Sequence, residues 1–297
     1  MKQLSIISGL IILVSFSLHL LTDQLLPPDP YDDEVTRENV LMNRFIGNYN
    51  VGFPVLTYQE FSESSSEEGA VSEAVFREHL EALQRAGYTS ITEERLVLYK
   101  NGNREALPEK PLLITMDDGY KSNYEVAYPV LEEMDMNATI FTVAGRRDQG
   151  VNNHFTWEEA REMVESGNIS IQSKTYDLHD RVENEEGEEV SSLTYRMPEE
   201  SDEAYRERVR EDLELSVDRI EEEVGNEVTT LSLPYGDYNE EVLEISEDLG
   251  IELFFSTYQN LNTEENLERG MMYRFGVEPD MSGRDLVQML EQTMYVD

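Results

Sequence analysis

Apolar β-type segments alternate with amphipathic helical segments along most of this chain, and that alternation limits the possible folds more than any other feature. The β-type segments are continuous apolar runs, which is typical of strands in a parallel sheet covered by helices. A length of 297 residues without internal repeats predicts one closed or nearly closed α/β barrel and requires no second full domain. The expected strands are Pro54–Tyr58, Leu112–Met116, Ala138–Val143, Ile169–Ser173, Thr229–Leu233, Leu253–Thr257 and Tyr273–Val277.

Helical segments with recognisable ends separate these strands. Ser72–Ala86 places apolar residues on one face and stops at Gly87. Thr156 opens a second helix with a capping box, in which Glu159 is the reciprocal partner. The stretch from about 180 to 202 is too rich in acidic and polar residues to bury itself, so we expect a loop insertion there. Further helices are expected up to Val224, over Glu240–Leu249 and over Arg284–Gln292.

The amino terminus predicts a location outside the cytoplasm. Lys2 precedes an apolar run of about 18 residues from Leu4 to Leu21, near the lower limit for a membrane span. A proline-rich linker follows, so a buried soluble helix is the weaker alternative. We expect a signal anchor or a cleaved signal over residues 1–26, a linker over 27–50 and the barrel over 51–297. A membrane partner is expected through the first of these segments.

The charge of the chain excludes one large class of partner. Lys and Arg total 23 against 63 Asp and Glu, giving a formal net charge of -40. A surface this negative repels phosphate backbones, so no nucleic-acid partner is expected. The acidic residues are spread along the whole chain, which favours hydration in high salt or the general composition of the host. Preference for a cationic glycan is the alternative.

The chain has no cysteine, so thiolate chemistry is excluded.

Neighbouring carboxylates stand where the second expected strand ends, in the run Thr115-Met116-Asp117-Asp118-Gly119. Carboxylates beside a buried strand are costly unless a cation, hydrogen bonds or solvent compensate them. In barrels of this class, chemistry gathers at the carboxyl ends of the strands. One acid bound to a metal and one moving protons is the functional interpretation. The structural alternative is a turn with an Asp at the helix N-cap.

Several motifs in order resemble those of the NodB-like polysaccharide deacetylases, carbohydrate esterase family 4. The carboxylate run resembles the T-F-D-D-G signature of that family. The other matching segments are Pro54–Gln59, Ser173–His179, Leu233–Gly236 and Phe254–Thr257, with Arg274 at the later arginine. The match covers about residues 51 to 280 and is closest in outline to the biofilm-type deacetylases of β-1,6-linked N-acetylglucosamine.

This resemblance implies a distorted (β/α) barrel that removes acetyl groups from N-acetylglucosamine polymers outside the cell. It also implies a divalent metal ion such as zinc. Asp117 would be the base, and Arg274 would orient it. Asp118 and His179 would be metal ligands. The backbone N–H of Tyr235 would help to stabilise the oxyanion.

Position 174 breaks the pattern, because Lys174 stands where the family has its first metal-binding histidine. An ammonium has no lone pair to give to a metal. We therefore predict that Lys174 pairs with Asp118 in place of a cation. Gln59 replaces a histidine of the opening motif, and Leu233 replaces an aromatic residue. Two hypotheses follow: an N-deacetylase with an altered centre, or a catalytically impaired relative that binds glycan or assists a partner.

The remaining aromatic and histidine side chains give weaker signals. His79 is expected on the exposed face of a helix, and His154 is expected to take no part in chemistry. Trp157 fits stacking on a sugar and packing under the barrel rim equally well. The sequence leaves the oligomeric state and the linkage of the glycan open.

Overall fold

A computed structural model describes residues 52–63 and 69–294 of the chain. The expected N-terminal anchor and linker, residues 1–26 and 27–50, lie outside these ranges. Within them, none of the helices combines the length and the apolar character needed to cross a bilayer.

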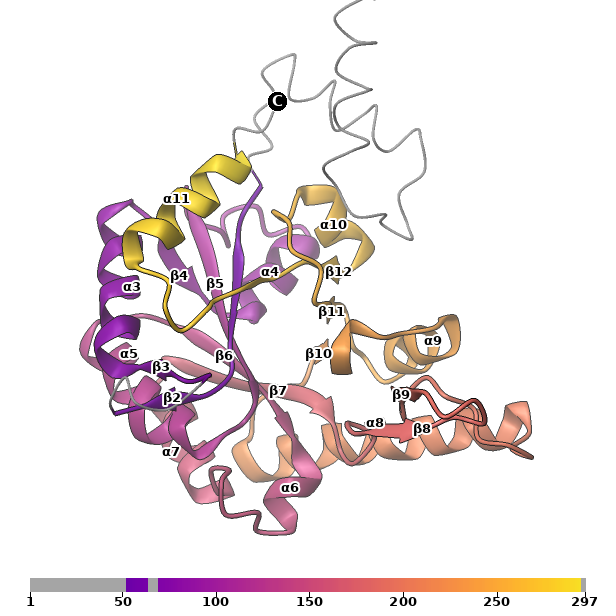
Figure 1. The fold of residues 1–297 in the computed structure, drawn as a ribbon. Helices are drawn as coiled ribbons and strands as arrows, with labels where there is room; N and C mark the ends of the chain where they lie inside the picture. Colours follow the sequence, from indigo (N-terminus) through magenta and orange to yellow (C-terminus); the bar gives the residue numbers. More distant parts are fainter. Residues whose placement is uncertain (1–51, 64–68, 295–297) are drawn as a thin grey trace, which may run out of the picture. The chain divides into compact units, whose positions relative to one another are not determined.

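A nine-stranded parallel sheet forms the centre of the fold (Figure 1). The strands are β1 (Val55–Tyr58), β4 (Thr89–Ile91), β5 (Pro111–Asp118), β6 (Ala138–Val143), β7 (Ile169–Thr175), β10 (Thr230–Ser232), β11 (Leu253–Phe255), β12 (Met271–Met272) and β13 (Phe275–Gly276). Their order is β12-β11-β10-β7-β6-β5-β1-β13, and β4 pairs with β5 off this path. The predicted α/β fold with a mostly parallel sheet is confirmed. The two edge strands, β12 and β13, follow each other in the chain, and no ladder joins them within the described ranges.

Helices surround this sheet (Figure 1). They are α3 (Glu73–Arg85), α4 (Glu93–Lys100), α5 (Tyr128–Glu133), α6 (Ala144–Asp148), α7 (Trp157–Glu165), α8 (Asp202–Val224), α9 (Glu240–Asp248), α10 (Glu264–Arg269) and α11 (Gly283–Met294), with a π turn η1 (Asn123–Ala127) and a 3-10 turn η2 (Pro234–Gly236). Helix α7 has the predicted capping box of Thr156 and Glu159. Helices α7 and α8 pack against β7, and α11 packs against α3.

The pleat of the strands separates an outer core from an inner one. In β5, Leu112, Ile114 and Met116 belong to the large apolar cluster shared with the helices. Leu113 belongs instead to a smaller cluster enclosed by the sheet. Successive side chains of a strand point to opposite faces, so Asp117 lies on the same inner side as Leu113, at the end of the strand. Apolar side chains fill the inner side of the sheet away from the carboxyl ends of the strands. Polar side chains occupy the inner side at the carboxyl ends.

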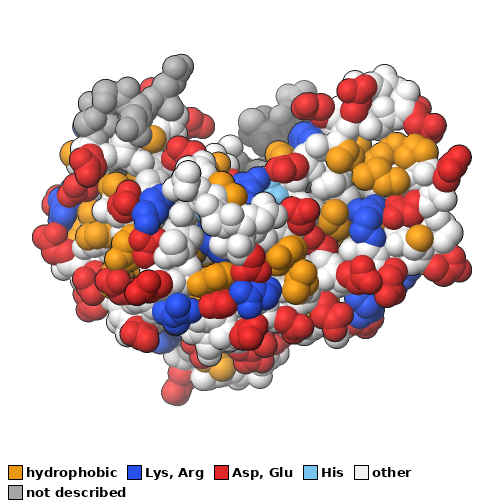
Figure 2. Space-filling model, turned by 90° about the horizontal axis from the view of Figure 1, so that it is seen from below, with side chains coloured by type: hydrophobic (Ala, Val, Ile, Leu, Met, Phe, Trp, Pro, Cys, Tyr) orange, Lys and Arg blue, Asp and Glu red, His pale blue; other side chains and the backbone are white. Residues whose placement is uncertain are grey.

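The acidic stretch expected as a loop contains a small antiparallel hairpin. Its strands are β8 (Arg181–Glu183) and β9 (Glu189–Ser191). A parallel two-stranded pair, β2 (Phe61–Ser62) with β3 (Val71–Ser72), lies outside the main sheet. Figure 2 shows acidic side chains spread over one whole face of the molecule, with Lys and Arg scattered among them. This distribution agrees with the expectation that the negative charge is general and not gathered in one patch.

Two expectations about individual segments are wrong. The strand expected over Tyr273–Val277 is limited to β13, Phe275–Gly276, because Tyr273 and Arg274 lie outside the ladder and Arg274 is buried. His79 is fully buried and not exposed. Its Nδ1 lies 3.2 Å from the hydroxyl of Tyr58, and its Nε2 lies 2.7 Å from the carbonyl oxygen of Met281. These two partners allow the ring to be buried without an unpaired polar atom.

Candidate functional site

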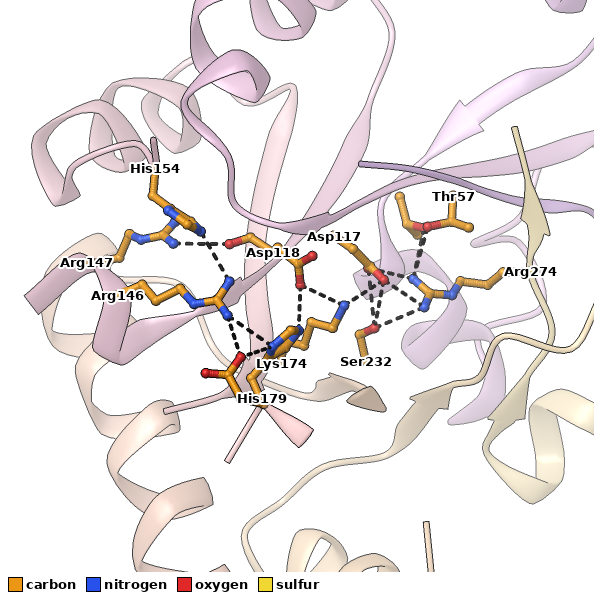
Figure 3. Close-up of polar contacts among 12 residues, drawn as sticks. Thr57, Asp117, Asp118, Arg146, Arg147, His154, Lys174, His179, Ser232 and Arg274 are labelled. Carbon is orange, nitrogen blue, oxygen red and sulfur yellow. Dashed lines mark hydrogen bonds and ion pairs between the residues drawn. The ribbon is translucent and has the colours of Figure 1, made fainter. Parts of the chain in front are cut away.

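Side chains from several strand ends meet at the carboxyl-end rim of the sheet (Figure 3). Asp117 is the next-to-last residue of β5, Lys174 lies near the end of β7, and Ser232 ends β10. Arg274 lies between β12 and β13. Carboxyl ends of parallel strands share one edge of a sheet, and this edge is where ligand sites of α/β folds lie. The sequence expectation that the site residues converge here is met for Asp117, Lys174 and Arg274.

Asp117 is held from several sides. Arg274 donates from Nη1 to Oδ1 at 2.7 Å and from Nη2 to Oδ2 at 3.0 Å. The Ser232 hydroxyl donates to Oδ1 at 3.3 Å, and Lys174 Nζ donates to Oδ2 at 3.0 Å. Burial alone would raise the pKa of Asp117, but Arg274 and Lys174 outweigh it and lower that pKa. Asp117 is therefore a buried, ionised carboxylate with two cationic partners.

Lys174 occupies the space between the two neighbouring carboxylates. Its ammonium lies 3.0 Å from Asp117 Oδ2 and 2.8 Å from Asp118 Oδ1, and the residue is only 4% exposed. A bulge in the pairing of β6 with β7 falls at this residue and ends the regular ladder there. Burial would lower the pKa of Lys174, but both carboxylates raise it above its ordinary value. The predicted pairing of Lys174 with Asp118 is confirmed, and Lys174 also reaches Asp117.

The backbone after Asp117 turns sharply, and Arg147 fixes the turn. Asp118 and Gly119 both have positive φ, 69° and 71°. The buried Arg147 guanidinium donates to the carbonyl oxygen of Gly119 at 2.5 Å and to that of Asp118 at 3.1 Å. This turn lets the Asp118 side chain reach the same cluster as Asp117. The Oδ1 atom of Asp118 lies 2.9 Å from His179 Nε2. Neither this close contact nor the one with Lys174 has the geometry of a straight hydrogen bond.

A buried carboxylate on α8 anchors the loop that carries His179. Asp212 accepts hydrogen bonds from the backbone N–H groups of Tyr176, Asp177 and Leu178 at 3.0, 2.6 and 3.0 Å. These bonds fix the chain just before His179. Asp212 is thus a positioning residue for the metal-ligand loop of the family pattern.

Tyr235 lies at the outer edge of the cluster. Its backbone is in the left-handed region with φ 60°, and its side chain is 39% exposed. The guanidinium carbon of Arg181, from the β8–β9 hairpin, lies 4.1 Å from the centre of its ring. The expected role of the Tyr235 backbone N–H at an oxyanion stays a prediction.

The cluster does not offer the donor set that a divalent metal requires. The resemblance implies ligands at Asp118, His179 and position 174, but Lys174 presents N–H donors and no lone pair. Its ammonium also stands in contact with the carboxylate that would bind the ion. Across residues 52–63 and 69–294, no group of three or more His, Cys, Asp or Glu side chains is placed to hold a metal. The charges of Asp117 and Asp118 are balanced by those of Lys174 and Arg274.

Other expected residues lie apart from this cluster. The side chain of Gln59 is exposed, and Leu233 is fully buried. Trp157 donates its indole N–H to Asp148 at 2.8 Å, on the surface between α6 and α7. Of the two sequence alternatives for Trp157, the described contacts favour packing.

Sequence reasoning missed two polar members of the site. Ser232 is the last residue of β10, and Arg146 lies in α6, the short helix that follows β6. Arg146 lies beside His154 and His179 (Figure 3). Both residues follow from the rule that strand ends converge, once every strand end is considered and not only those with family motifs.

Comparisons with known proteins agree with this geometry. The sequence profile of the family described as polysaccharide deacetylase matches residues 104–254. YxkH of Bacillus subtilis (strain 168), which is assigned to the polysaccharide deacetylases, is 31% identical over 232 residues, or 77% of this chain and 73% of that protein. The poly-beta-1,6-N-acetyl-D-glucosamine N-deacetylase of Escherichia coli (strain K12) is 24% identical over 73% of this chain, which spans only 35% of that relative.

A solved structure shows the same fold. The de-N-acetylase from Aggregatibacter actinomycetemcomitans superimposes with a TM-score of 0.72 at 23% identity, covering 80% of this chain and 98% of that one. At this identity the likeness shows the fold alone. The profile match and the Bacillus relative establish that this chain belongs to the polysaccharide deacetylase family and is a deacetylase-like protein related to the poly-N-acetylglucosamine deacetylases.

Proposed function

We propose that this chain removes N-acetyl groups from N-acetylglucosamine polymers, with the Lys174 ammonium at a position where the family generally uses a divalent metal ion. The observation that carries the proposal is the retained Asp117 carboxylate, ionised and held by Arg274 at the rim of the sheet. The names of the related proteins support the substrate class.

The described side chains supply each part of a hydrolysis. Asp117 accepts a proton from water, and the water oxygen bonds to the acetamide carbonyl carbon. The Lys174 ammonium and the backbone N–H of Tyr235 stabilise the negative charge that develops on the carbonyl oxygen. Asp117 then returns the proton to the nitrogen as the C–N bond breaks, which gives a free amine and acetate. No atom outside the chain, the water and the substrate is needed.

The same contacts predict slow turnover. Two cations lower the pKa of Asp117, and a carboxylate with a low pKa is a weak base. A single ammonium also provides less positive charge than a divalent ion. We therefore expect turnover well below that of a metal-dependent relative.

Acetate release from β-1,6-linked N-acetylglucosamine oligomers tests the proposal. We expect wild-type protein to release acetate at the same rate with and without a chelator. Asp117→Asn should lower the rate by roughly 10²- to 10⁴-fold, the contribution typical of a general base. Asp218→Asn, an exposed carboxylate on α8, is the matched control. Loss of activity on chelation would show a metal-dependent reaction, and absence of acetate from wild-type protein would refute the hydrolase.

Glycan binding without turnover is the alternative function to be tested. Asp117 has cationic partners on both oxygens, so no free oxygen is directed at a substrate in the described contacts. In this case the oligomers would bind, and Asp117→Asn would leave their affinity almost unchanged. Calorimetric titration of wild type and variant, beside the acetate assay, separates the two functions.

The body of the protein acts outside the cytoplasm in this proposal. Support comes from the apolar run Leu4–Leu21 and the proline-rich linker that follows it. Protease treatment of intact cells tests this location. Full-length protein should be degraded from outside, whereas full protection would place the body in the cytoplasm.

A further inference from the structure

The guanidinium of Arg146 lies between two histidine rings and a carboxylate (Figure 3). Its Nη2 lies 3.2 Å from His179 Nδ1, and its Nη1 lies 3.4 Å from His154 Nε2. Nη2 also donates to Asp180 Oδ1 at 2.9 Å. Arg146 lies in α6, the short helix that follows β6, directly before the buried Arg147, so this helix positions it at the rim.

Hydrogen positions on both rings can be assigned from these partners. A guanidinium is a donor at every nitrogen, so each ring nitrogen that faces Arg146 must offer a lone pair. His154 then carries its hydrogen on Nδ1, which agrees with the 2.7 Å contact from that atom to Asn153 Oδ1. His179 carries its hydrogen on Nε2, which agrees with the 2.9 Å contact from that atom to Asp118 Oδ1. A carboxylate oxygen has only lone pairs, so the opposite assignment would set two lone pairs against each other.

Asp180 is the one described group that favours the other tautomer of His179. Its Oδ1 lies 3.3 Å from His179 Nδ1 and would accept a hydrogen from it. The same oxygen already accepts from Arg146 at the shorter distance of 2.9 Å, and the Asp180 side chain is 77% exposed. Arg146 thus occupies the Asp180 oxygen that would have to accept a hydrogen bond from Nδ1 of His179.

We propose that Arg146 holds His179 with a lone pair on Nδ1 and its hydrogen on Nε2, so that this ring presents an N–H and not a lone pair to Asp118. A metal-ligating imidazole needs a lone pair on the nitrogen that faces the ion and an acceptor for its other N–H. Here the facing nitrogen carries hydrogen, and a cation stands at the other one. The metal site of the family pattern is therefore closed at His179 as well as at Lys174. This inference is independent of turnover.

Nitrogen-15 NMR of the imidazole rings tests the tautomer in the wild-type protein. The ring of His179, assigned from the signals lost in His179→Gln, should show the hydrogen on Nε2 and a lone pair on Nδ1. In Arg146→Met, a substantial population with hydrogen on Nδ1 should appear as Asp180 becomes available. Hydrogen on Nδ1 in the wild type, or an unchanged tautomer in Arg146→Met, would overturn the proposal.

Zinc affinity gives a second, independent test. Competition against a chromophoric chelator should show weak zinc binding by Lys174→His alone. The double variant Lys174→His/Arg146→Met should bind zinc roughly 10- to 100-fold more tightly, the usual effect of a residue that orients a metal ligand. Lys174→His/Arg161→Met, which removes a surface arginine on α7 instead, is the matched control. Equal affinities for the two double variants would contradict the role of Arg146.

Discussion

The ammonium of Lys174 lies 2.8 Å from Asp118 Oδ1, and both residues are at most 5% exposed. Neither charge would be tolerated alone at such burial, because an ionised group loses its hydration there. Each group therefore makes the other possible, and Asp117 and Arg274 complete a neutral set. The Lys174 ammonium, a cation of the chain itself, thus stabilises the two carboxylates of the family pattern.

Removing the ammonium should destabilise the fold strongly. In Lys174→Gln, Asp117 keeps Arg274 but Asp118 loses its lysine partner while remaining buried. Breaking a buried pair on one side typically costs about 3–5 kcal/mol of unfolding free energy. Denaturant titration measures this loss. Lys121→Gln, which removes the partner of Glu159 at a more exposed site, should cost under about 1 kcal/mol. Similar small losses in both variants would show that Lys174 is not a structural cation.

The contribution of Asp118 should depend on pH in one direction. Burial would raise the pKa of Asp118, but Lys174 and His179 outweigh burial and lower it. A folded-state pKa below the unfolded value stabilises the fold above the unfolded pKa, and this contribution is lost as the pH falls. The stability difference between wild type and Asp118→Asn should therefore shrink by about 1.4 kcal/mol per pH unit below about pH 4. A gap that widens in acid would contradict the pairing.

Gly119 should be intolerant of a side chain for two separate reasons. Its φ is +71°, and a Cβ there would lie 2.3 Å from Arg147 Nη1 and 2.6 Å from Thr142 Oγ1. Gly119→Ala should cost roughly 2–5 kcal/mol of unfolding free energy, the sum of backbone strain and overpacking. Gly150→Ala has φ +65° and open space around the new Cβ, so only the backbone cost of about 1–2 kcal/mol is expected. Equal losses in thermal or chemical unfolding would show that contact with Arg147 is unimportant.

Asp212 should keep the loop before His179 ordered. Asp212→Ala leaves the three backbone N–H groups that it accepts without their partner. We expect a loss of about 2–4 kcal/mol in unfolding free energy and faster hydrogen exchange at Tyr176, Asp177 and Leu178. Asp218→Ala, exposed on the same helix, should change neither. Unaltered exchange at those amides would rule out the anchoring role.

Short-range residue patterns were enough to predict a buried strand, a helix start and one ion pair. The continuous apolar run before Asp117 predicted a buried strand, and the pleat then places Asp117 inward. The capping residues Thr156 and Glu159 predicted the start of α7. The missing lone pair of Lys174 was enough to predict its pairing with Asp118, because an ammonium beside a buried carboxylate has few other stable arrangements.

Contacts between distant segments could not be predicted in the same way. His79 has the spacing of a helix residue at the edge of the apolar face, and only Tyr58 and Met281 make its burial favourable. Arg146 acquires its partners from two separate loops, one before α7 and one after β7. The start of the last strand only after Arg274 depends on the contact of that arginine with Asp117, which lies far away in the sequence.

The zinc content of the purified wild-type protein tests the central claim most directly. After incubation with excess zinc and gel filtration, elemental analysis should find far less than one ion per chain, because Lys174 already occupies the contact with Asp118. One tightly held zinc ion per chain, lost on substitution of Asp118 or His179, would contradict the claim that an ammonium has taken the place of the metal.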